Sequence, residues 1–208
     1  MYSQLGLMGT SSLMYTCMAI LAAYFIGNIS PAILLGRAKG IDIKKEGSGN
    51  AGTTNVLRIL GKKAAVTTLI IDILKGTAAV VLGGTLFGEQ VACLCVAAVF
   101  CGHVWPAFFG FKGGKGVATA FGALMGFDYR MGLTALLIVA IGVLVSKRMS
   151  FGSILGAATF PIVAWYFNKA FMPIGIVLGI LIIVKHRANL VRLIRGEEPV
   201  IGQKKKEG

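Results

Sequence analysis

Charged residues are scarce in this chain of 208 residues. Only 14% of them are Asp, Glu, Lys or Arg, whereas a soluble domain carries about 25%. Hydrophobic residues make up 56% of the chain, and they fall in blocks of the length that crosses about 30 Å of hydrocarbon as helix. This composition excludes a soluble domain with a large core and predicts an integral membrane protein.

The chain also lacks a basic N-terminal segment and paired cysteines, and both absences restrict the kind of protein that it can be. No basic residue precedes Arg37, so the chain lacks the charged start of a cleaved signal peptide, and we expect its first hydrophobic run to be retained as a helix. No pair of cysteines has CxxC spacing, which argues against a metal site and against a disulfide framework. All four lie in hydrophobic runs, at Cys17, Cys93, Cys95 and Cys101.

The hydrophobic runs predict an all-α integral membrane protein with seven transmembrane helices. A kink is expected near Pro31, within the first helix. The fourth run is too short to span unless the glycine-rich loop before it enters the membrane. The predicted helices cover about residues 12–35, 64–87, 91–109, 117–127, 131–145, 151–167 and 171–184.

Acidic residues are also few, and the basic excess is unevenly distributed. The stretches 36–63, 111–116, 146–150 and 185–208 hold 18 of the 21 Lys and Arg residues. Because cytoplasmic loops are enriched in Lys and Arg, this asymmetry predicts an outside N-terminus and a cytoplasmic C-terminus. It also explains the net charge of +13 without a nucleic-acid partner. We expect residues 1–200 to form a single membrane-embedded domain, followed by a basic cytoplasmic tail at 201–208.

A polar stretch interrupts the hydrophobic pattern at residues 47–58, Gly-Ser-Gly-Asn-Ala-Gly-Thr-Thr-Asn-Val-Leu-Arg. Glycine lets backbone amides approach a ligand closely, and a helix opened by Thr and Asn starts with amides that lack intrahelical partners. With Arg58 about one turn into that helix, the stretch predicts a phosphate or carboxylate site. It also matches G-x-G-x-x-G, but a dinucleotide fingerprint requires a preceding strand, and the flanks here are membrane helices.

A second glycine-rich loop, Gly-Gly-Lys-Gly, occupies residues 113–116. It lacks the upstream glycine of a nucleotide-binding P-loop, and Gly116 stands where that motif has Ser or Thr. A glycine nest with a lysine at a helix entry would suit a small phosphate. A tight interhelical turn with an interfacial lysine explains the same pattern equally well.

His186 and Asn189 are three residues apart, so they share a helical face at the cytoplasmic end of the last predicted helix. The basic residues around them are typical of an interfacial helix on anionic lipid, at about 1 kcal/mol per basic residue. That alternative explains Arg195 and the lysines at 204–206, but it explains His186 and Asn189 poorly.

Three titratable residues, Asp72, Lys75 and His103, lie inside predicted membrane helices. Such residues are costly at membrane depth and normally face the interior of a helix bundle. We therefore expect a buried polar brace between the helices at 64–87 and 91–109, with Asp72 and Lys75 paired at i,i+3.

The sequence shows no Ser-His-Asp or Cys-His arrangement, so covalent catalysis through an acyl-enzyme is not indicated.

Five motifs follow one another along the chain. They are the stretch at 47–58, Asp-Ile-Leu-Lys-Gly at 72–76, Gly-His-Val-Trp-Pro at 102–106, Lys-Gly-Gly-Lys-Gly-Val-Ala-Thr at 112–119 and Lys-His-Arg-Ala-Asn-Leu-Val-Arg-Leu at 185–193. With these motifs in this order, the chain resembles the bacterial acyl-phosphate:glycerol-3-phosphate acyltransferases, the PlsY family. The resemblance covers nearly the whole chain except its first ten residues and the part after Pro199.

The resemblance implies transfer of a fatty acyl group from acyl phosphate to the 1-hydroxyl of sn-glycerol 3-phosphate, which gives lysophosphatidic acid and phosphate in phospholipid biosynthesis. It implies no cofactor and no metal, a multi-pass protein of the bacterial plasma (inner) membrane, and an active site that faces the cytoplasm. A soluble acyl-ACP:phosphate acyltransferase would supply the donor, and acyl-CoA would not serve.

The resemblance also assigns roles to residues. Ser48 and its loop would hold the phosphate of the donor, whereas Arg58, Lys115, His186 and Asn189 would bind glycerol 3-phosphate. Glu198 fits the family's acidic position, with Glu197 as the alternative, and His186 is either a ligand or a general base. The other expected substrate-binding residues are Gly47, Gly49, Asn50, Gly52, Thr53, Asn55, Gly113, Gly114, Gly116, Ser150 and Ser153.

Two other classes of function remain as alternatives. Charges at membrane depth and broken helices are also found in transporters or channels for phosphate or organic anions, but such proteins often have matching halves, and no internal repeat is evident. An inactive membrane scaffold for lipid-synthesis enzymes would tolerate loss of Arg58 or His186.

Overall fold

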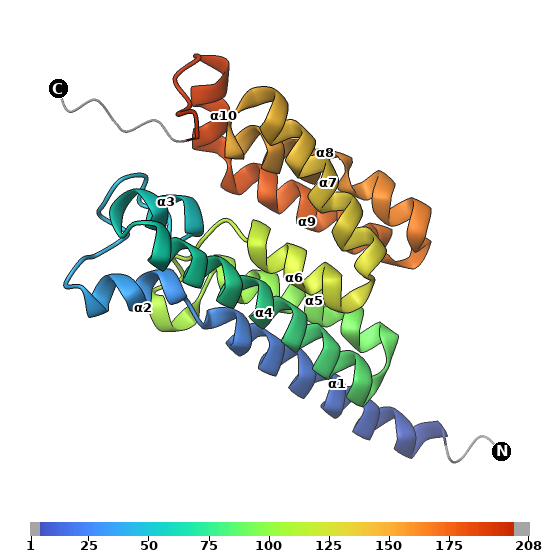
Figure 1. Cartoon of the computed structure of the whole chain (residues 1–208). Coiled ribbons are helices and arrows are strands. Elements are labelled where there is room, and N and C mark those ends of the chain that lie inside the picture. Colours follow the sequence, from blue (N-terminus) through green and yellow to red (C-terminus); the bar gives the residue numbers. More distant parts are fainter. Residues whose placement is uncertain (1–4, 202–208) are drawn as a thin grey trace. The chain divides into compact units, whose positions relative to one another are not determined.

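The computed structural model describes the backbone of residues 5–201 and the side chains of residues 12–201. All regular secondary structure in this range is helical (Figure 1). The α-helices are α1 (Leu5–Asn28), α2 (Pro31–Ala38), α3 (Thr53–Ile59), α4 (Lys62–Phe87), α5 (Glu89–Val104), α6 (Val117–Phe127), α7 (Tyr129–Ser146), α8 (Met149–Phe167), α9 (Met172–Lys185) and α10 (Arg187–Ile194), with 3₁₀ turns η1 (Ala107–Phe109) and η2 (Lys169–Phe171).

The helices form two compact units, one within residues 1–129 and the other within residues 130–208. The expectation of a single domain over residues 1–200 stays a prediction. Of the expected basic tail, residues 202–208 lie outside the described residues.

In the first unit, α1, α4, α5 and α6 run alongside one another, and α2 and α3 pack against α4 (Figure 1). Glycines allow the close approach of these helices. A Cβ at Gly102 of α5 would meet the Tyr24 carbonyl of α1, and a Cβ at Gly122 of α6 would meet the Ile73 carbonyl of α4. The hydroxyl of Thr77 donates to the Gly122 carbonyl at 2.7 Å, so α4 and α6 are also joined by a hydrogen bond.

In the second unit, α8 packs along α9, and α10 contacts both. α7 approaches α8 closely because Gly142 faces Gly152, where an added Cβ would lie 2.8 Å from the Gly152 Cα. The turn between α8 and α9 is fixed by Asn168, whose side-chain oxygen accepts hydrogen bonds from the amides of Ala170 and Phe171.

Most predicted helices are confirmed within a few residues, including the interruption between Asn28 and Pro31. Three expectations about helix ends are wrong. The helix expected to begin at about residue 12 begins at Leu5. The helix expected to reach residue 109 ends at Val104, because Pro106 disfavours helical backbone at the residue before it. The helix expected to begin at residue 151 begins at Met149, so Ser150 lies in a helix rather than in a turn.

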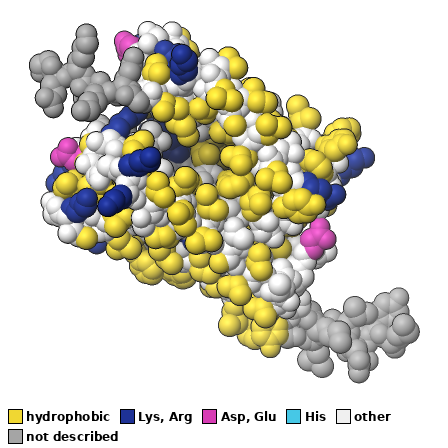
Figure 2. Space-filling view, viewed as in Figure 1, with side chains coloured by type: hydrophobic (Ala, Val, Ile, Leu, Met, Phe, Trp, Pro, Cys, Tyr) yellow, Lys and Arg dark blue, Asp and Glu magenta, His cyan; other side chains and the backbone are white. Residues whose placement is uncertain are grey.

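The described helices have the lengths and composition of membrane spans. Five are long and apolar enough to cross a membrane, or six if α9 and α10 count as one bent span. Many large hydrophobic side chains are exposed, and they dominate the face shown in Figure 2. Such a surface fits lipid rather than water, whereas the expected number of seven spans and the orientation of the termini stay predictions.

Candidate functional site

The loop between α2 and α3 is held in shape by Asn55. The Asn55 side chain donates to the carbonyls of Ile43 at 3.2 Å and Glu46 at 3.0 Å, and it accepts from the Ser48 amide at 2.9 Å. Asn55 is 1% exposed. All of these contacts are to the backbone of the loop, so Asn55 fixes the path of the chain from residue 43 to residue 48.

Two glycines of this loop have a conformation that other residues rarely adopt. Gly47 has φ +60° and Gly49 has φ +68°. A Cβ at Gly47 would also collide with Oδ1 of Asn55. The Asn55 side chain can therefore occupy its place only because residue 47 is a glycine. The Ser48 side chain lies between these glycines and is exposed, which leaves its hydroxyl accessible to a ligand.

Lys44 ties this loop to the segment that follows α5. Its ammonium donates to the Phe109 carbonyl at 2.6 Å, and Arg37 stacks over the Phe109 ring at 5.2 Å. Burial lowers the pKa of Lys44, and the charges of Arg37 and Lys112 lower it further, whereas Asp42 opposes them. Neither Lys44 nor Phe109 was expected at the site, because nothing in the sequence relates two residues 65 positions apart.

The second glycine-rich loop folds back onto the end of α5. The amides of Gly113 and Gly114 donate to the carbonyls of Val104 and His103, both at 3.2 Å. A Cβ at Gly114 would collide with Nε2 of His103 and would lie 2.9 Å from the Ala51 carbonyl of the first loop. The two glycine-rich loops therefore lie against each other at this point, and only a residue without a side chain fits between them.

The remaining expected residues of the first unit lie on or beside these loops. Thr53 begins α3 after Gly52, and its buried hydroxyl has no hydrogen-bond partner within the described residues. Arg58 lies in the last turn of α3 with an exposed side chain. Lys115 is partly buried just before α6, and Gly116 enters that helix with φ +85° over the ring of Phe100.

The expected buried brace is confirmed. The Lys75 ammonium lies 2.7 Å from Oδ1 of Asp72 and 2.9 Å from Nδ1 of His103, and it donates to the Ile29 carbonyl at 2.6 Å. Nδ1 of His103 is 3.3 Å from the same Asp72 oxygen. The three side chains thus join α4, α5 and the interruption between α1 and α2. All three residues are buried.

In the second unit, Glu198 contacts residues of α8, of α10 and of the turn before α8. Its Oε1 accepts hydrogen bonds from Ser150 of α8 at 2.8 Å and from Asn189 of α10 at 2.6 Å, whereas its Oε2 pairs with Arg192 at 2.7 Å. The Glu198 carbonyl accepts from Nε of Arg148 at 2.9 Å. Glu198 is therefore the acidic residue built into this unit, and the neighbouring Glu197 is exposed.

The environment of Glu198 favours the carboxylate. Burial alone would raise its pKa, but hydrogen bonds from Asn189, Ser150 and Arg192, together with the charge of Arg192, hold the pKa of Glu198 below its ordinary value. The sequence indicated Glu198 only through the resemblance to the family's acidic position, with Glu197 as the alternative. It did not indicate that Ser150 and Asn189 share the same carboxylate oxygen.

His186 lies at a bend rather than at the end of one continuous helix, so that expectation was wrong. α9 ends at Lys185 and α10 begins at Arg187, with a 62° change of direction. His186 is 4% exposed, and its Nδ1 lies 2.8 Å from the Ile182 carbonyl. In a neutral ring Nδ1 then carries the hydrogen, and Nε2 is left as an acceptor.

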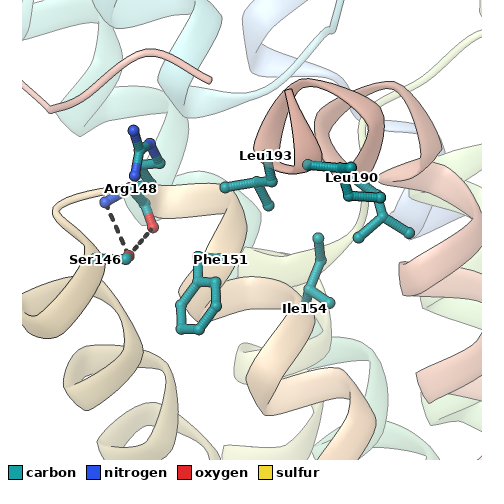
Figure 3. A pocket seen from close by; sticks show the side chains of 7 residues that line it. Ser146, Arg148, Phe151, Ile154, Leu190 and Leu193 are labelled. Carbon is teal, nitrogen blue, oxygen red and sulfur yellow. Dashed lines mark hydrogen bonds between the residues drawn. The ribbon is translucent and has the colours of Figure 1, made fainter. Parts of the chain in front are cut away.

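A small cavity of about 430 Å³ lies between the start of α8 and α10. Phe151 and Ile154 project into it from α8, opposite Leu190 and Leu193 of α10, whereas Arg148 lies at its edge (Figure 3). Ser153 is buried in the next turn of α8, and its hydroxyl donates to the Met149 carbonyl at 2.9 Å. No group of three His, Cys, Asp or Glu side chains in the described part of the chain is placed to hold a metal ion.

Comparisons with known proteins agree with this architecture. A family model described as glycerol-3-phosphate acyltransferase matches residues 17–196. A glycerol-3-phosphate acyltransferase of Thermoanaerobacter pseudethanolicus is 43% identical over 195 residues, covering 92% of this chain and 98% of the relative.

Two crystal structures of PlsY (YgiH), an integral membrane glycerol 3-phosphate acyltransferase, are similar in fold. The glycerol 3-phosphate form has a TM-score of 0.83 and 36% identity, and the match covers 90% of this chain and 96% of that one. The lysophosphatidic acid form has a TM-score of 0.82 and 34% identity, with 90% and 95% covered.

Proposed function

Because the chain belongs to the glycerol-3-phosphate acyltransferase family, we propose that it transfers a fatty acyl group from acyl phosphate to the 1-hydroxyl of sn-glycerol 3-phosphate. The products are lysophosphatidic acid and inorganic phosphate. The observation that carries this proposal is the contact between the two glycine-rich loops, at Gly114 and Ala51, beside the exposed Ser48 and the partly buried Lys115.

The proposed chemistry needs no protein nucleophile. An acyl phosphate is a mixed anhydride with a good leaving group, so the acceptor hydroxyl can attack its carbonyl directly. As the new ester bond forms, the bond from the acyl carbon to the phosphate oxygen breaks. The protein must hold two anions close together, and fixed positive groups and oriented amides can offset their repulsion and supply much of the rate enhancement.

The loop at residues 47–52 is proposed to hold the phosphate of the donor. Ser48 is exposed between two glycines of positive φ, and backbone amides of such glycine-rich loops bind anions at other sites. The buried Thr53 hydroxyl adds a donor without a partner among the described residues. Asn55 has a different role in this proposal, because its side chain is used to shape the loop.

Glycerol 3-phosphate is proposed to be bound by Arg58, Lys115, His186 and Asn189. Arg58 and Lys115 would supply the positive charges for its phosphate. In the second unit, Glu198 accepts from the Asn189 amide and so sets the direction of that side chain. The carboxylate would position Asn189 and Ser150, and it would not act on the substrate itself.

The hydroxyl proton is proposed to leave with the departing phosphate, with His186 as a ligand of the acceptor. Because Nδ1 of His186 bonds the Ile182 carbonyl, its Nε2 can accept a hydrogen bond from a hydroxyl of glycerol 3-phosphate. If His186→Gln keeps most of kcat and raises the KM for glycerol 3-phosphate, His186 is a ligand. A collapse of kcat with an unchanged KM would identify a general base.

We place this reaction at the cytoplasmic face of the bacterial inner membrane, with seven spans and an outside N-terminus. The basic loops support that orientation. α6 has 11 residues, so it would complete the seventh span together with the glycine-rich loop before it. A soluble acyl-ACP:phosphate acyltransferase is the proposed source of the donor, and lipid is the medium into which the product passes.

The decisive assay uses the purified chain in lipid nanodiscs with acyl phosphate and glycerol 3-phosphate. Release of phosphate should depend on glycerol 3-phosphate, and acyl-CoA should give no product. Ser48→Ala and Arg58→Ala should each lower kcat/KM at least about tenfold, which is about 1.4 kcal/mol. Thr85→Ala is the matched control, because Thr85 is exposed on α4 and bonds only its own helix. Phosphate release that does not depend on glycerol 3-phosphate would contradict the proposal.

A further inference from the structure

The buried Asp72–Lys75–His103 cluster reaches the glycine-rich loops through one residue. Nδ1 of His103 faces Lys75 and Asp72 at 2.9 and 3.3 Å. The opposite ring nitrogen, Nε2, lies against Gly114, so closely that a Cβ there would overlap it. The imidazole is therefore packed between a buried ion pair and the loop that carries Lys115.

The backbone of the same residue reinforces this contact. The His103 carbonyl accepts from the Gly114 amide at 3.2 Å, and the neighbouring Val104 carbonyl accepts from the Gly113 amide. Gly114 in turn lies against the Ala51 carbonyl of the first loop. Gly114 is thus in contact with both His103 and the first loop.

The cluster also reaches the approach to the first loop. Lys75 donates to the Ile29 carbonyl at 2.6 Å, and Ile29 lies in the interruption between α1 and α2. At this break the Ile29 carbonyl lies outside both helices, and the Lys75 ammonium supplies a hydrogen bond to it. The ammonium therefore stabilises the break that directs α2 toward residues 39–52. Asp72 balances the charge of Lys75 at 2.7 Å, which permits a buried ammonium at this position.

We propose that His103 is a positioning residue for acyl transfer, which sets the second glycine-rich loop, and with it Lys115, against the first loop. The buried Asp72–Lys75 pair holds the imidazole in the orientation that this requires. The inference rests on the proposed function, and it adds a role for residues that contact neither substrate. A displacement of the loop by about 1 Å is enough to cost roughly 100-fold in rate.

Three variants of His103 test this inference in nanodiscs, with KM, kcat and melting temperature measured for each. His103→Ala removes both ring nitrogens, and it should raise the KM for glycerol 3-phosphate at least about tenfold. His103→Asn places an amide near the Nδ1 position, where it can meet Lys75, but it does not reach Gly114. His103→Gln reaches the Nε2 position. We expect Gln to restore the KM more fully than Asn.

The control is Thr77→Val, which removes the hydrogen bond between α4 and α6 without touching either loop. It should lower the melting temperature and leave the KM unchanged. If Thr77→Val raises the KM as much as a His103 variant of similar melting temperature does, or if Asn restores the KM as well as Gln does, His103 is only structural and the inference is wrong. If His103→Ala does not fold, the Asn and Gln comparison decides the question.

The two proposals fail in different ways. Wild-type protein that releases no phosphate in the presence of glycerol 3-phosphate contradicts the proposed function. In that case binding decides the inference, because glycerol 3-phosphate that binds should still raise the melting temperature of the wild type. Loss of that rise in His103→Ala and its return in His103→Gln would support a positioning role. An equal rise in both variants, or none in the wild type, would overturn it.

Discussion

Two residues that carry no proposed chemistry decide the geometry of the residues that do. Asn55 forms three hydrogen bonds to the backbone around Ser48, and Glu198 accepts from Ser150, Asn189 and Arg192. Buried polar side chains of this kind are costly to leave half-satisfied. Their substitution therefore acts on the neighbouring ligands rather than on charge at the site.

Asn55→Ala should raise the KM for acyl phosphate at least about tenfold, with a smaller effect on the KM for glycerol 3-phosphate. The change leaves the Ser48 amide and two carbonyls without their partner, and each buried unpaired group costs about 1–3 kcal/mol. Steady-state kinetics in nanodiscs provide the measurement. The control is Thr67→Ala, whose exposed hydroxyl bonds only within α4. Unchanged kinetics in Asn55→Ala would show that the loop keeps its shape without the hydrogen bonds of Asn55.

Glu198 predicts a pH dependence of stability. A carboxylate whose folded pKa lies below its unfolded value stabilises the folded state above the unfolded pKa, about 4.3, and this contribution is lost as the pH falls through the folded pKa. Glu198→Gln should therefore lower the melting temperature at pH 7. The difference from the wild type should shrink on acidification below about pH 4. A difference that grows on acidification would contradict the assigned direction.

At the scale of elements, helix entries and exits place the site. Gly116 opens α6 in a left-handed conformation, and a Cβ there would overlap the ring of Phe100. Gly110 closes η1 in a similar conformation, with φ +66° and nothing within 4 Å of an added Cβ. A substitution at Gly110 would therefore test backbone strain alone, whereas one at Gly116 would add a steric overlap with Phe100.

Gly116→Ala should accordingly lower the melting temperature and raise the KM for glycerol 3-phosphate, since α6 must shift to accommodate the methyl group. Gly110→Ala should show only the cost of a left-handed Ala, about 1–2 kcal/mol, and normal kinetics. Thermal unfolding and steady-state kinetics on both variants test this. Equal effects of the two substitutions would mean that the contact with Phe100 is relieved at little cost.

Hydrophobic runs predicted most of the helices because lipid-facing helices are apolar over their whole length. The end of α5 was missed, although Pro106 signals it, because the apolar run continues to Phe109. The bend at His186 has no such signal, since neither proline nor glycine marks the sequence from Val184 to Asn189. That bend depends on where the chain packs after α9, which local sequence does not specify.

The candidate site was predicted in part. The motif at 47–58 indicated an anion loop, but it placed Asn55 among the ligands, whereas its partners Ile43 and Glu46 lie 12 and 9 residues away. The pairing of Asp72 with Lys75 followed from helical spacing and is confirmed. The contact of His103 with Gly114 did not follow, because it depends on the fold of residues 105–113 back along α5.

At the scale of the whole molecule, topology is the property that sequence predicts and that labelling can test. In a variant without the four native cysteines, a cysteine at Lys39 should be cytoplasmic and one at Lys169 should be outside. A membrane-impermeant maleimide should therefore label Lys169→Cys in intact cells and Lys39→Cys only after lysis. Both positions are exposed. The reverse pattern would overturn the proposed orientation.

Glu198 also sets an order of events during biosynthesis. Every described helix precedes it in the chain, so the ribosome delivers this carboxylate only after α8, α9 and α10 have been synthesised. Until then Ser150 and Asn189 lack the acceptor that they share. A nascent chain that stops after α10 would present its helices to the membrane with these two side chains still unaligned, and they gain their shared acceptor only when Glu198 is added.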